Sequence, residues 1–473
     1  MPAVTFAYRG SIFAEKDAIP LLCTVFAAAL AMRLSFALMV PFQSGDWPLY
    51  RDVARNILSG CGVAVTGPAG CAPHFGGNQL PLFPAFVAVL WYVVGPSEMA
   101  VRIAQSIVAS LSVAWLAYAV LASTRSHAAG YAAGGLLAFS VAQAFWAGGL
   151  QTETLALAST QWVLAELLLS FAAGRFRVGP VGIAMVAATW ARLDGILLLV
   201  PVAAAAFAIG GTRKGLRAAF LVALITGTPL AAWAVRNVGV GISPFPIYGV
   251  MPDGTAAPTG YVAWLNTWVA TARQHADTGF FGPSHYERIK VDPEAYHDAA
   301  ERAEVEALLA RLRTVSGQPF PPDIDAAFSR LAGQRRAEQT FLERAQRDGT
   351  RAWALMKPWI WDQRPPTDNP LTGVALFVVV FMQVTRLAVV AGFALTAGIG
   401  AFSGPGVVRF LAGLSALYVV TRLVFFIGLA GIEYRYMIEL APFIESTAAV
   451  GVGLLLVRIH RRGYGLPADR VPE

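Results

Sequence analysis

The chain has 473 residues, of which 56% are hydrophobic and 14% charged, and its formal net charge is +7. A soluble globular protein carries roughly 25% charged residues, so this composition excludes an ordinary soluble domain and predicts a polytopic membrane protein. The Lys and Arg residues are dispersed over many loops, which is typical of cytoplasmic loop bias and argues against nucleic-acid binding.

Ten apolar runs predict an all-α protein, because a segment crosses hydrocarbon only if it satisfies every backbone polar group internally. With the N-terminus inside, the loops rich in Arg and Lys fall on the cytoplasmic side, as the positive-inside rule requires. No small-residue cleavage site follows the first run, so we expect a retained anchor. The expected spans lie near residues 19–40, 100–122, 127–147, 151–172, 178–191, 194–210, 217–235, 371–399, 407–430 and 436–457.

The segment Leu80–Val94 is apolar but short, at about fifteen residues where a span needs about 20. We therefore expect a re-entrant or interfacial helix within the first external loop, residues 42–99. If this segment also crosses the membrane, the bundle has eleven spans in place of ten.

Asp46 follows the first span, and behind it come apolar residues at positions 47, 50, 53, 54 and 57, three to four apart. This pattern predicts a helix lying along the membrane surface with its aromatic residues at headgroup depth. A carboxylate there is well placed to act on a lipid-borne substrate, but Asp is also favoured as a helix cap, and both interpretations remain open. Cys61 and Cys71 share this loop and could form a disulfide if it faces an oxidising compartment.

Residues 236–370 differ from the rest, with Pro, Gly and aromatic residues followed by charged helical stretches. These stretches are Asp298–Arg313 and Asp323–Met356, the second with a weak point at Gly333. A connection this long indicates a functional element, and we expect a mainly helical external lid. The expected organisation is a catalytic transmembrane module (1–235), the lid (236–370), and C-terminal helices with a basic cytoplasmic tail (371–473).

Charged residues are predicted to gather on the external membrane face, at or near span ends, where charge is costly and usually functional. Each has a simpler explanation: helix-dipole partners, a local pair between Arg192 and Asp194, or a pair of Arg435 with Glu433 or Glu439. Together, acids and arginines suit attack of a hydroxyl on a sugar whose leaving group is a lipid phosphate. The external set comprises Asp46, Glu153, Asp194, Arg236 and Arg435, with Arg192 beside Asp194.

Several motifs occur in an order that resembles the GT-C membrane glycosyltransferases, in particular the family 39 branch of protein O-mannosyltransferases and the aminoarabinose–lipid A transferase. The resemblance covers the membrane portion, about two-thirds of the chain, and excludes the lid from about 250 to 350. The motifs are Asp46 with Tyr50, ARNILSG, QLPLFPAF, VRIAQ, QTETL, ARLDG, WAVRN and EYRYMIELAPF.

The resemblance implies a GT-C-type bundle in a bacterial inner membrane and inverting transfer of one sugar from a polyprenyl-phosphate donor. The acceptor would be a hydroxyl of a glycolipid, an envelope glycan or a protein on the periplasmic face. Asp46 is then the general base, Glu153 the second catalytic acid residue, and Arg236 and Arg435 contacts of the phosphate. The expected substrate-binding residues are Tyr50, His74, Gln79, Arg192, Asp194, Arg236, Arg435 and Tyr436.

Two features depart from that family. Relatives of the aminoarabinose type often carry a basic residue just before the proline that corresponds to Pro81, where this chain has Gln79 and Leu80. Outside the lid, where Asp323 and Asp325 form one, the sequence contains no Asp-x-Asp pair, so a bound divalent metal is not supported, and no other cofactor is expected. A lone loop histidine such as His74 is more often solvated or structural than catalytic.

The alternative function is a lipid or glycolipid transporter or flippase without transferase activity.

Overall fold

A computed structural model of the chain is mostly helical, and its described residues include six helices long and apolar enough to cross a membrane, or seven if one bent pair is a single span. The prediction of a multi-pass helical membrane protein is confirmed, whereas the count of ten or eleven spans stays a prediction. The structure describes residues 15–39, 41–43, 46–67, 70–72, 80–241, 244, 258–278, 286–356, 373–403, 406–429, 432 and 434–463.

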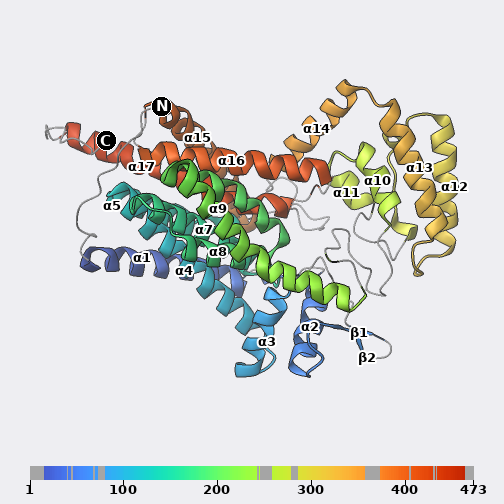
Figure 1. The fold of residues 1–473 in the computed structure, drawn as a ribbon, viewed down its shortest axis with the longest axis horizontal. Coiled ribbons are helices and arrows are strands. Elements are labelled where there is room, and N and C mark those ends of the chain that lie inside the picture. Colours follow the sequence, from blue (N-terminus) through green and yellow to red (C-terminus); the bar gives the residue numbers. More distant parts are fainter. Residues whose placement is uncertain are drawn as a thin grey trace.

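The bundle is built around α7. Within the most apolar stretch of this helix, 78% of the residues are buried, so α7 is surrounded by protein and not by lipid. Its neighbours include α4 and α8, and Figure 1 shows the long helices running side by side. The bundle helices are α1 (Glu15–Met39), α4 (Glu98–Thr124), α5 (His127–Ala138), α6 (Val141–Ala147), α7 (Glu153–Ala172), α8 (Val178–Ala191), α9 (Leu199–Gly239), α15 (Gly373–Ser403), α16 (Gly406–Leu429) and α17 (Ala441–Gly463).

Two regions of the bundle contain a break in a helix. The span expected at 127–147 is bent by 49° between α5 and α6. Helix α9 breaks at Gly211, whose φ of 66° lies outside the helical region. A Cβ at Gly215 would lie 2.7 Å from the Cα of Phe207, eight residues earlier, which a straight helix would hold far away. The chain therefore reverses there, as the separate spans 194–210 and 217–235 require.

The first external loop contains α2 (Trp47–Leu58), a hairpin of β1 (Val65–Gly67) and β2 (Gly70–Ala72), and α3 (Leu82–Val94). The apolar face of α2 is not spread on lipid as expected. Trp47 is fully buried and its ring meets Trp91 of α3 edge-on, while Tyr50 meets Phe83 in the same way. Because α3 covers this face, α2 is held against the protein.

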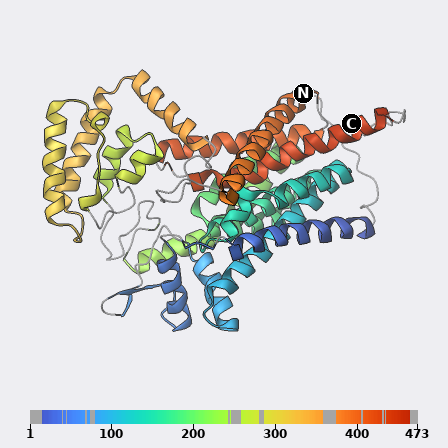
Figure 2. The same cartoon turned by 180° about the vertical axis from the view of Figure 1, so that it is seen from behind.

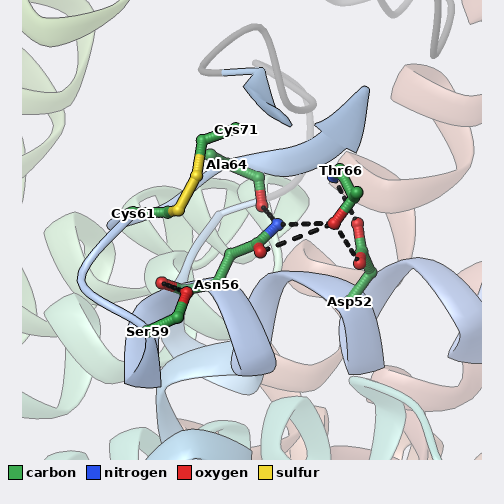
Figure 3. The surroundings of a disulfide bond; sticks show 7 residues. All are labelled: Asp52, Asn56, Ser59, Cys61, Ala64, Thr66 and Cys71. Atoms are coloured by element: carbon green, nitrogen blue, oxygen red, sulfur yellow. Dashed lines mark hydrogen bonds between the residues drawn. A yellow bond between two sulfur atoms is a disulfide. The ribbon is translucent and has the colours of Figure 1, made fainter. Parts of the chain in front are cut away.

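The hairpin is tied to α2 by a disulfide and by polar side chains (Figure 3). Cys61 and Cys71 form the disulfide, so the pairing that the sequence allowed is present. Asp52 accepts hydrogen bonds from the backbone and side chain of Thr66, and Asn56 donates to the Ala64 carbonyl. These bonds fix the loop that follows α2.

The lid helices form a separate layer beyond one end of the bundle, the end that also carries α2 and the hairpin (Figures 1 and 2). Their core is aromatic, with the rings of Tyr261, Trp264 and Phe328 in mutual contact at centroid distances of 5.0–6.1 Å. The expected helical stretch 323–356 is interrupted at Gln339–Thr340, and Gly333 lies within a helix. The lid comprises α10 (Thr259–Trp268), α11 (Ala272–Asp277), α12 (Ala299–Thr314), α13 (Pro322–Glu338) and α14 (Phe341–Met356).

Candidate active site

Asp46 occupies the position before the first turn of α2, but its side chain makes no capping hydrogen bond. Its carboxylate instead accepts a hydrogen bond of 3.1 Å from Nη1 of Arg435, a residue 389 positions later. The Asp46 side chain is 37% exposed and that of Arg435 is 27% exposed. The local capping interpretation is therefore wrong for the side chain, which points instead to a distant arginine.

This ion pair is the exposed end of a longer network of alternating charge. Nη1 of Arg435 lies 3.7 Å from Glu153, and Arg192 donates to the same Glu153 oxygen at 3.1 Å. Arg192 also pairs at 3.1 Å with Asp194 and with Glu439. Arg422 closes the network with contacts of 2.7 Å to Asp194 and to Glu439. The network holds four carboxylates and three guanidinium groups.

The elements that carry these groups meet at the lid-side end of the bundle. Glu153 begins α7, and Asp194 lies in the short 3-10 helix Leu193–Leu198 that joins α8 to α9. Arg435 and Glu439 lie in a second 3-10 helix, Tyr434–Leu440, before α17. Glu153, Glu439 and Arg422 are at most 1% exposed. Buried charges are tolerated only when they are paired, and here each carboxylate meets an arginine.

Two side chains of α4 hold the loops that present Asp46 and Glu153. Nε of Arg102 donates to the Gly148 carbonyl at 3.0 Å and its Nη2 to the Phe42 carbonyl at 3.4 Å. Gln105 donates to the carbonyls of Ala147 and Gly149. Backbone pairing between Phe42 and Gly149 reinforces this contact. The VRIAQ motif thus fixes one acidic loop against the other.

Two tyrosines border the network. The ring of Tyr436 lies 5.4 Å from the guanidinium carbon of Arg192 and 5.7 Å from that of Arg435, and it stacks on Phe426. Burial, together with the negative charges of Asp46 and Glu153, raises the pKa of the Tyr50 phenol. Tyr50 therefore remains a neutral hydroxyl beside the acids.

The structure brings together most of the residues that the sequence singled out. Arg236 differs, since its described hydrogen bonds go to the Val63 carbonyl and to Asn237, and its guanidinium lies over the Trp233 ring. His74 and Gln79 lie outside the described residues. The residues that share the network or border it are Asp46, Tyr50, Glu153, Arg192, Asp194, Arg435 and Tyr436.

Sequence reasoning missed Arg422 and assigned Glu439 only as a local partner of Arg435. In the structure Glu439 pairs with Arg192 and Arg422, and Arg435 pairs with Asp46 and Glu153. The signal was present, because Arg422 is an ionisable residue inside an apolar span and such residues are costly and usually functional. Its partners come from segments too distant in sequence to be paired with it by pattern.

The network is not built as a metal site. In the described part of the chain, no three His, Cys, Asp or Glu side chains are grouped so that they could hold a metal ion. Arginines separate the carboxylates of the network from one another.

No protein-family model and no curated protein matches the sequence. Among solved structures, ArnT from Cupriavidus metallidurans bound to undecaprenyl phosphate is 13% identical, with a TM-score of 0.36, over 95% of this chain and 80% of that one. Its apo form is 14% identical, with a TM-score of 0.35, over 94% and 80%. The Archaeoglobus fulgidus oligosaccharyltransferase tethered with an acceptor peptide is 14% identical, with a TM-score of 0.45, over 95% of this chain but 51% of that one. These similarities extend over most of the chain at low sequence identity.

Proposed function

We propose that this protein is a membrane glycosyltransferase that moves one sugar from a polyprenyl-phosphate donor to a hydroxyl acceptor of the cell envelope, with inversion. The observation that carries the proposal is the partly exposed carboxylate of Asp46, held 3.1 Å from Arg435 at the accessible end of a buried charge network. A base that a substrate can reach and a cation for a leaving phosphate are thereby adjacent.

In the proposed reaction, the acceptor oxygen forms a bond to the anomeric carbon and its proton passes to Asp46. The bond between that carbon and the phosphate oxygen breaks, and polyprenyl phosphate leaves with the electron pair. Arg435 stabilises the negative charge that develops on this phosphate, because guanidinium groups bind phosphate through charge-assisted hydrogen bonds. Its side chain is 27% exposed, so a donor phosphate can reach it.

The buried part of the network supports this geometry. Glu153 is 1% exposed and contacts both Arg192 and Arg435, so it orients the guanidinium that faces the donor. Arg192 is in turn fixed by Asp194 and Glu439. A reacting pair whose buried neighbours are held by ion pairs keeps its position without reorganisation during the reaction. Glu153 therefore acts by positioning Arg435.

The test is release of polyprenyl phosphate by purified protein in detergent, with a polyprenyl-phosphate-linked sugar and an acceptor extract from cell envelopes. Asp46→Asn should reduce the rate by about 10²–10⁴-fold, the usual contribution of a general base. Asp52→Asn is the matched control, since Asp52 lies on the same helix and bonds to Thr66. Full activity in the Asp46 variant would refute the base assignment. Movement of an intact donor lipid without sugar release would favour the transporter alternative.

The proposal includes the sidedness of the site and the role of the lid. We assign ten or eleven spans in a bacterial inner membrane. Asp46 and the lid (236–370) then face the periplasm. In the sequence, the lid separates the catalytic transmembrane module (1–235) from the C-terminal helices (371–473). The common location of α2 and the lid helices at one end of the bundle supports this assignment (Figure 1). A cysteine at exposed Gly349 should react with an impermeant reagent in intact cells, and one at exposed Arg213 should not. The reverse result would exclude this topology.

A further inference from the structure

An open pocket of about 270 Å³ lies where the lid meets the end of α16. Its lining comes from the facing parts of α13 and α14, from Asn266 of α10, and from Ile427 and Gly428 of α16. Figure 1 shows α14 reaching from the lid toward this end of α16. The volume falls just below the ~300–1,000 Å³ of typical ligand pockets, which suits a small headgroup.

The pocket carries more positive than negative charge. Arg336, Arg344, Arg347 and Arg351 line it, and Asp348 is the lone acidic residue in its described lining. Asp348 lies 3.0 Å from Arg347 and 3.5 Å from Arg351. Within the described part of the chain, Arg336 and Arg344 form no ion pair. The described lining therefore holds four guanidinium groups and one carboxylate, which only Arg347 and Arg351 contact.

Two of these arginines are anchored by backbone carbonyls. Arg351 donates to the carbonyls of Val269, Asn266 and Ile427 at 2.7–3.1 Å. Arg347 donates to the Thr267 carbonyl at 3.1 Å. Burial, followed by the positive charge of Arg347, lowers the pKa of Arg351 to about 10, so its guanidinium stays charged at neutral pH. An anion bound nearby would stabilise this charged form. Anchored donors lose little conformational entropy when a ligand binds.

The two remaining arginines and one amide are available on the pocket wall. Arg336 and Arg344 are exposed, and each makes one long hydrogen bond to a carbonyl, of 3.3 and 3.4 Å. Oδ1 of Asn266 is buried and finds no hydrogen-bond partner among the described residues. Because the oxygen and nitrogen of an amide are interchangeable by a flip, Asn266 can present a donor to a ligand.

We propose that this pocket binds the phosphate group of an anionic lipid headgroup. Arginine is the residue that matches phosphate geometry with several parallel donors. A lipid is the source because Ile427 and Gly428 lie at the end of a candidate membrane span. Trp353 of α14 is 69% exposed, and tryptophan is enriched at membrane–water interfaces. The site is distinct from the charge network around Asp46, and it ties the lid to the membrane surface.

The test measures binding of dioctanoyl phosphatidylglycerol, uncharged dioctanoylglycerol and inorganic phosphate to the full-length protein in detergent, by native mass spectrometry and thermal shift. Phosphatidylglycerol should bind the wild-type protein and raise its Tm. Its Kd should rise at least tenfold in Arg344→Gln/Arg347→Gln and in Arg336→Gln/Arg344→Gln, whose altered side chains are both exposed. Arg302→Gln, on the distant helix α12, is the control and should bind as the wild type does. Asp46→Asn should also bind normally, so loss of transfer and loss of this site are separable.

Equal affinity of wild type and both pocket variants would overturn the proposal, as would equal binding of phosphatidylglycerol and dioctanoylglycerol. If inorganic phosphate binds as tightly as the lipid and the variants lose it, the phosphate chemistry stands and the lipid source is refuted.

Discussion

The guanidinium of Arg422 and the carboxylate of Asp194 lie 2.7 Å apart in the structure and 228 positions apart in the sequence. Arg422 also donates to Glu439 at 2.7 Å and to the Tyr436 carbonyl at 2.9 Å. One fully buried side chain of α16 thereby joins the turn after α8 to the 3-10 helix that carries Arg435. The stability of the site and its geometry thus depend on the same ion pairs.

Replacing Arg422 by methionine should therefore destabilise the protein strongly. The change leaves two buried carboxylates with one partner fewer, and breaking a buried pair costs about 3–5 kcal/mol. Thermal unfolding in detergent measures the loss. Arg409→Gln, an exposed arginine on the same helix, should leave Tm unchanged. Adding Glu439→Gln to Arg422→Met should cost less than the two single changes together, because the residues are coupled. Additive losses would contradict the network.

Replacing Arg435 by glutamine should weaken donor binding. The change removes the cation that faces Asp46 and Glu153, and a hydrogen bond to a charged group contributes about 1.5–3 kcal/mol. At 1.4 kcal/mol per decade, this is roughly a 10–100-fold rise in the Kd for the polyprenyl-phosphate sugar. Arg435→Lys should lose less, because it keeps the charge. Arg55→Gln, on the exposed side of α2, is the control. Unchanged donor affinity in Arg435→Gln would remove Arg435 from the phosphate site.

The sequence predicted the parts of the site that depend on local pattern. Membrane depth follows from apolar runs, and so the sequence placed Asp46, Glu153 and Asp194 at span ends. Pairing could not be predicted, because Asp46 and Arg435 meet only after the two ends of the chain pack together. The expected contact between the apolar face of α2 and lipid was wrong for a related reason. An apolar helix face identifies no partner, and here α3 supplied one in place of lipid.

In the lid, too, the helices could be predicted from the sequence but their contacts with the bundle could not. Its helices follow from composition and capping, since Asp298 caps α12 by accepting from the Glu301 amide. The contact of Arg351 with the Ile427 carbonyl, which joins the lid to α16, has no signature in either segment.

Removing the disulfide of the first external loop should loosen the hairpin without unfolding the bundle. Cys61 and Cys71 are separated by ten positions, and closing a loop of that length contributes roughly 2–3 kcal/mol in the chain-entropy model. Cys61→Ser/Cys71→Ser should therefore be cut faster in this loop by a protease of broad specificity. Cys23→Ser is the control, because Cys23 is a free thiol in α1. Equal cleavage rates in the double variant and the wild type would show that polar contacts alone hold the hairpin.

Replacing Gln105 by leucine should reduce the transfer rate more than it affects donor binding. Gln105 touches the carbonyls of Ala147 and Gly149, so its loss frees the loop before Glu153 while Arg435 keeps its charge and its ion pair with Asp46. A displacement of about 1 Å at a reacting group can cost about 10²-fold in rate. The measurement is kcat and KM for polyprenyl phosphate release, with Ser123→Ala at the far end of the same helix as the control. A rise in KM at constant kcat would show instead that this loop binds the donor, and an unchanged kcat/KM would show that Gln105 has no positioning role.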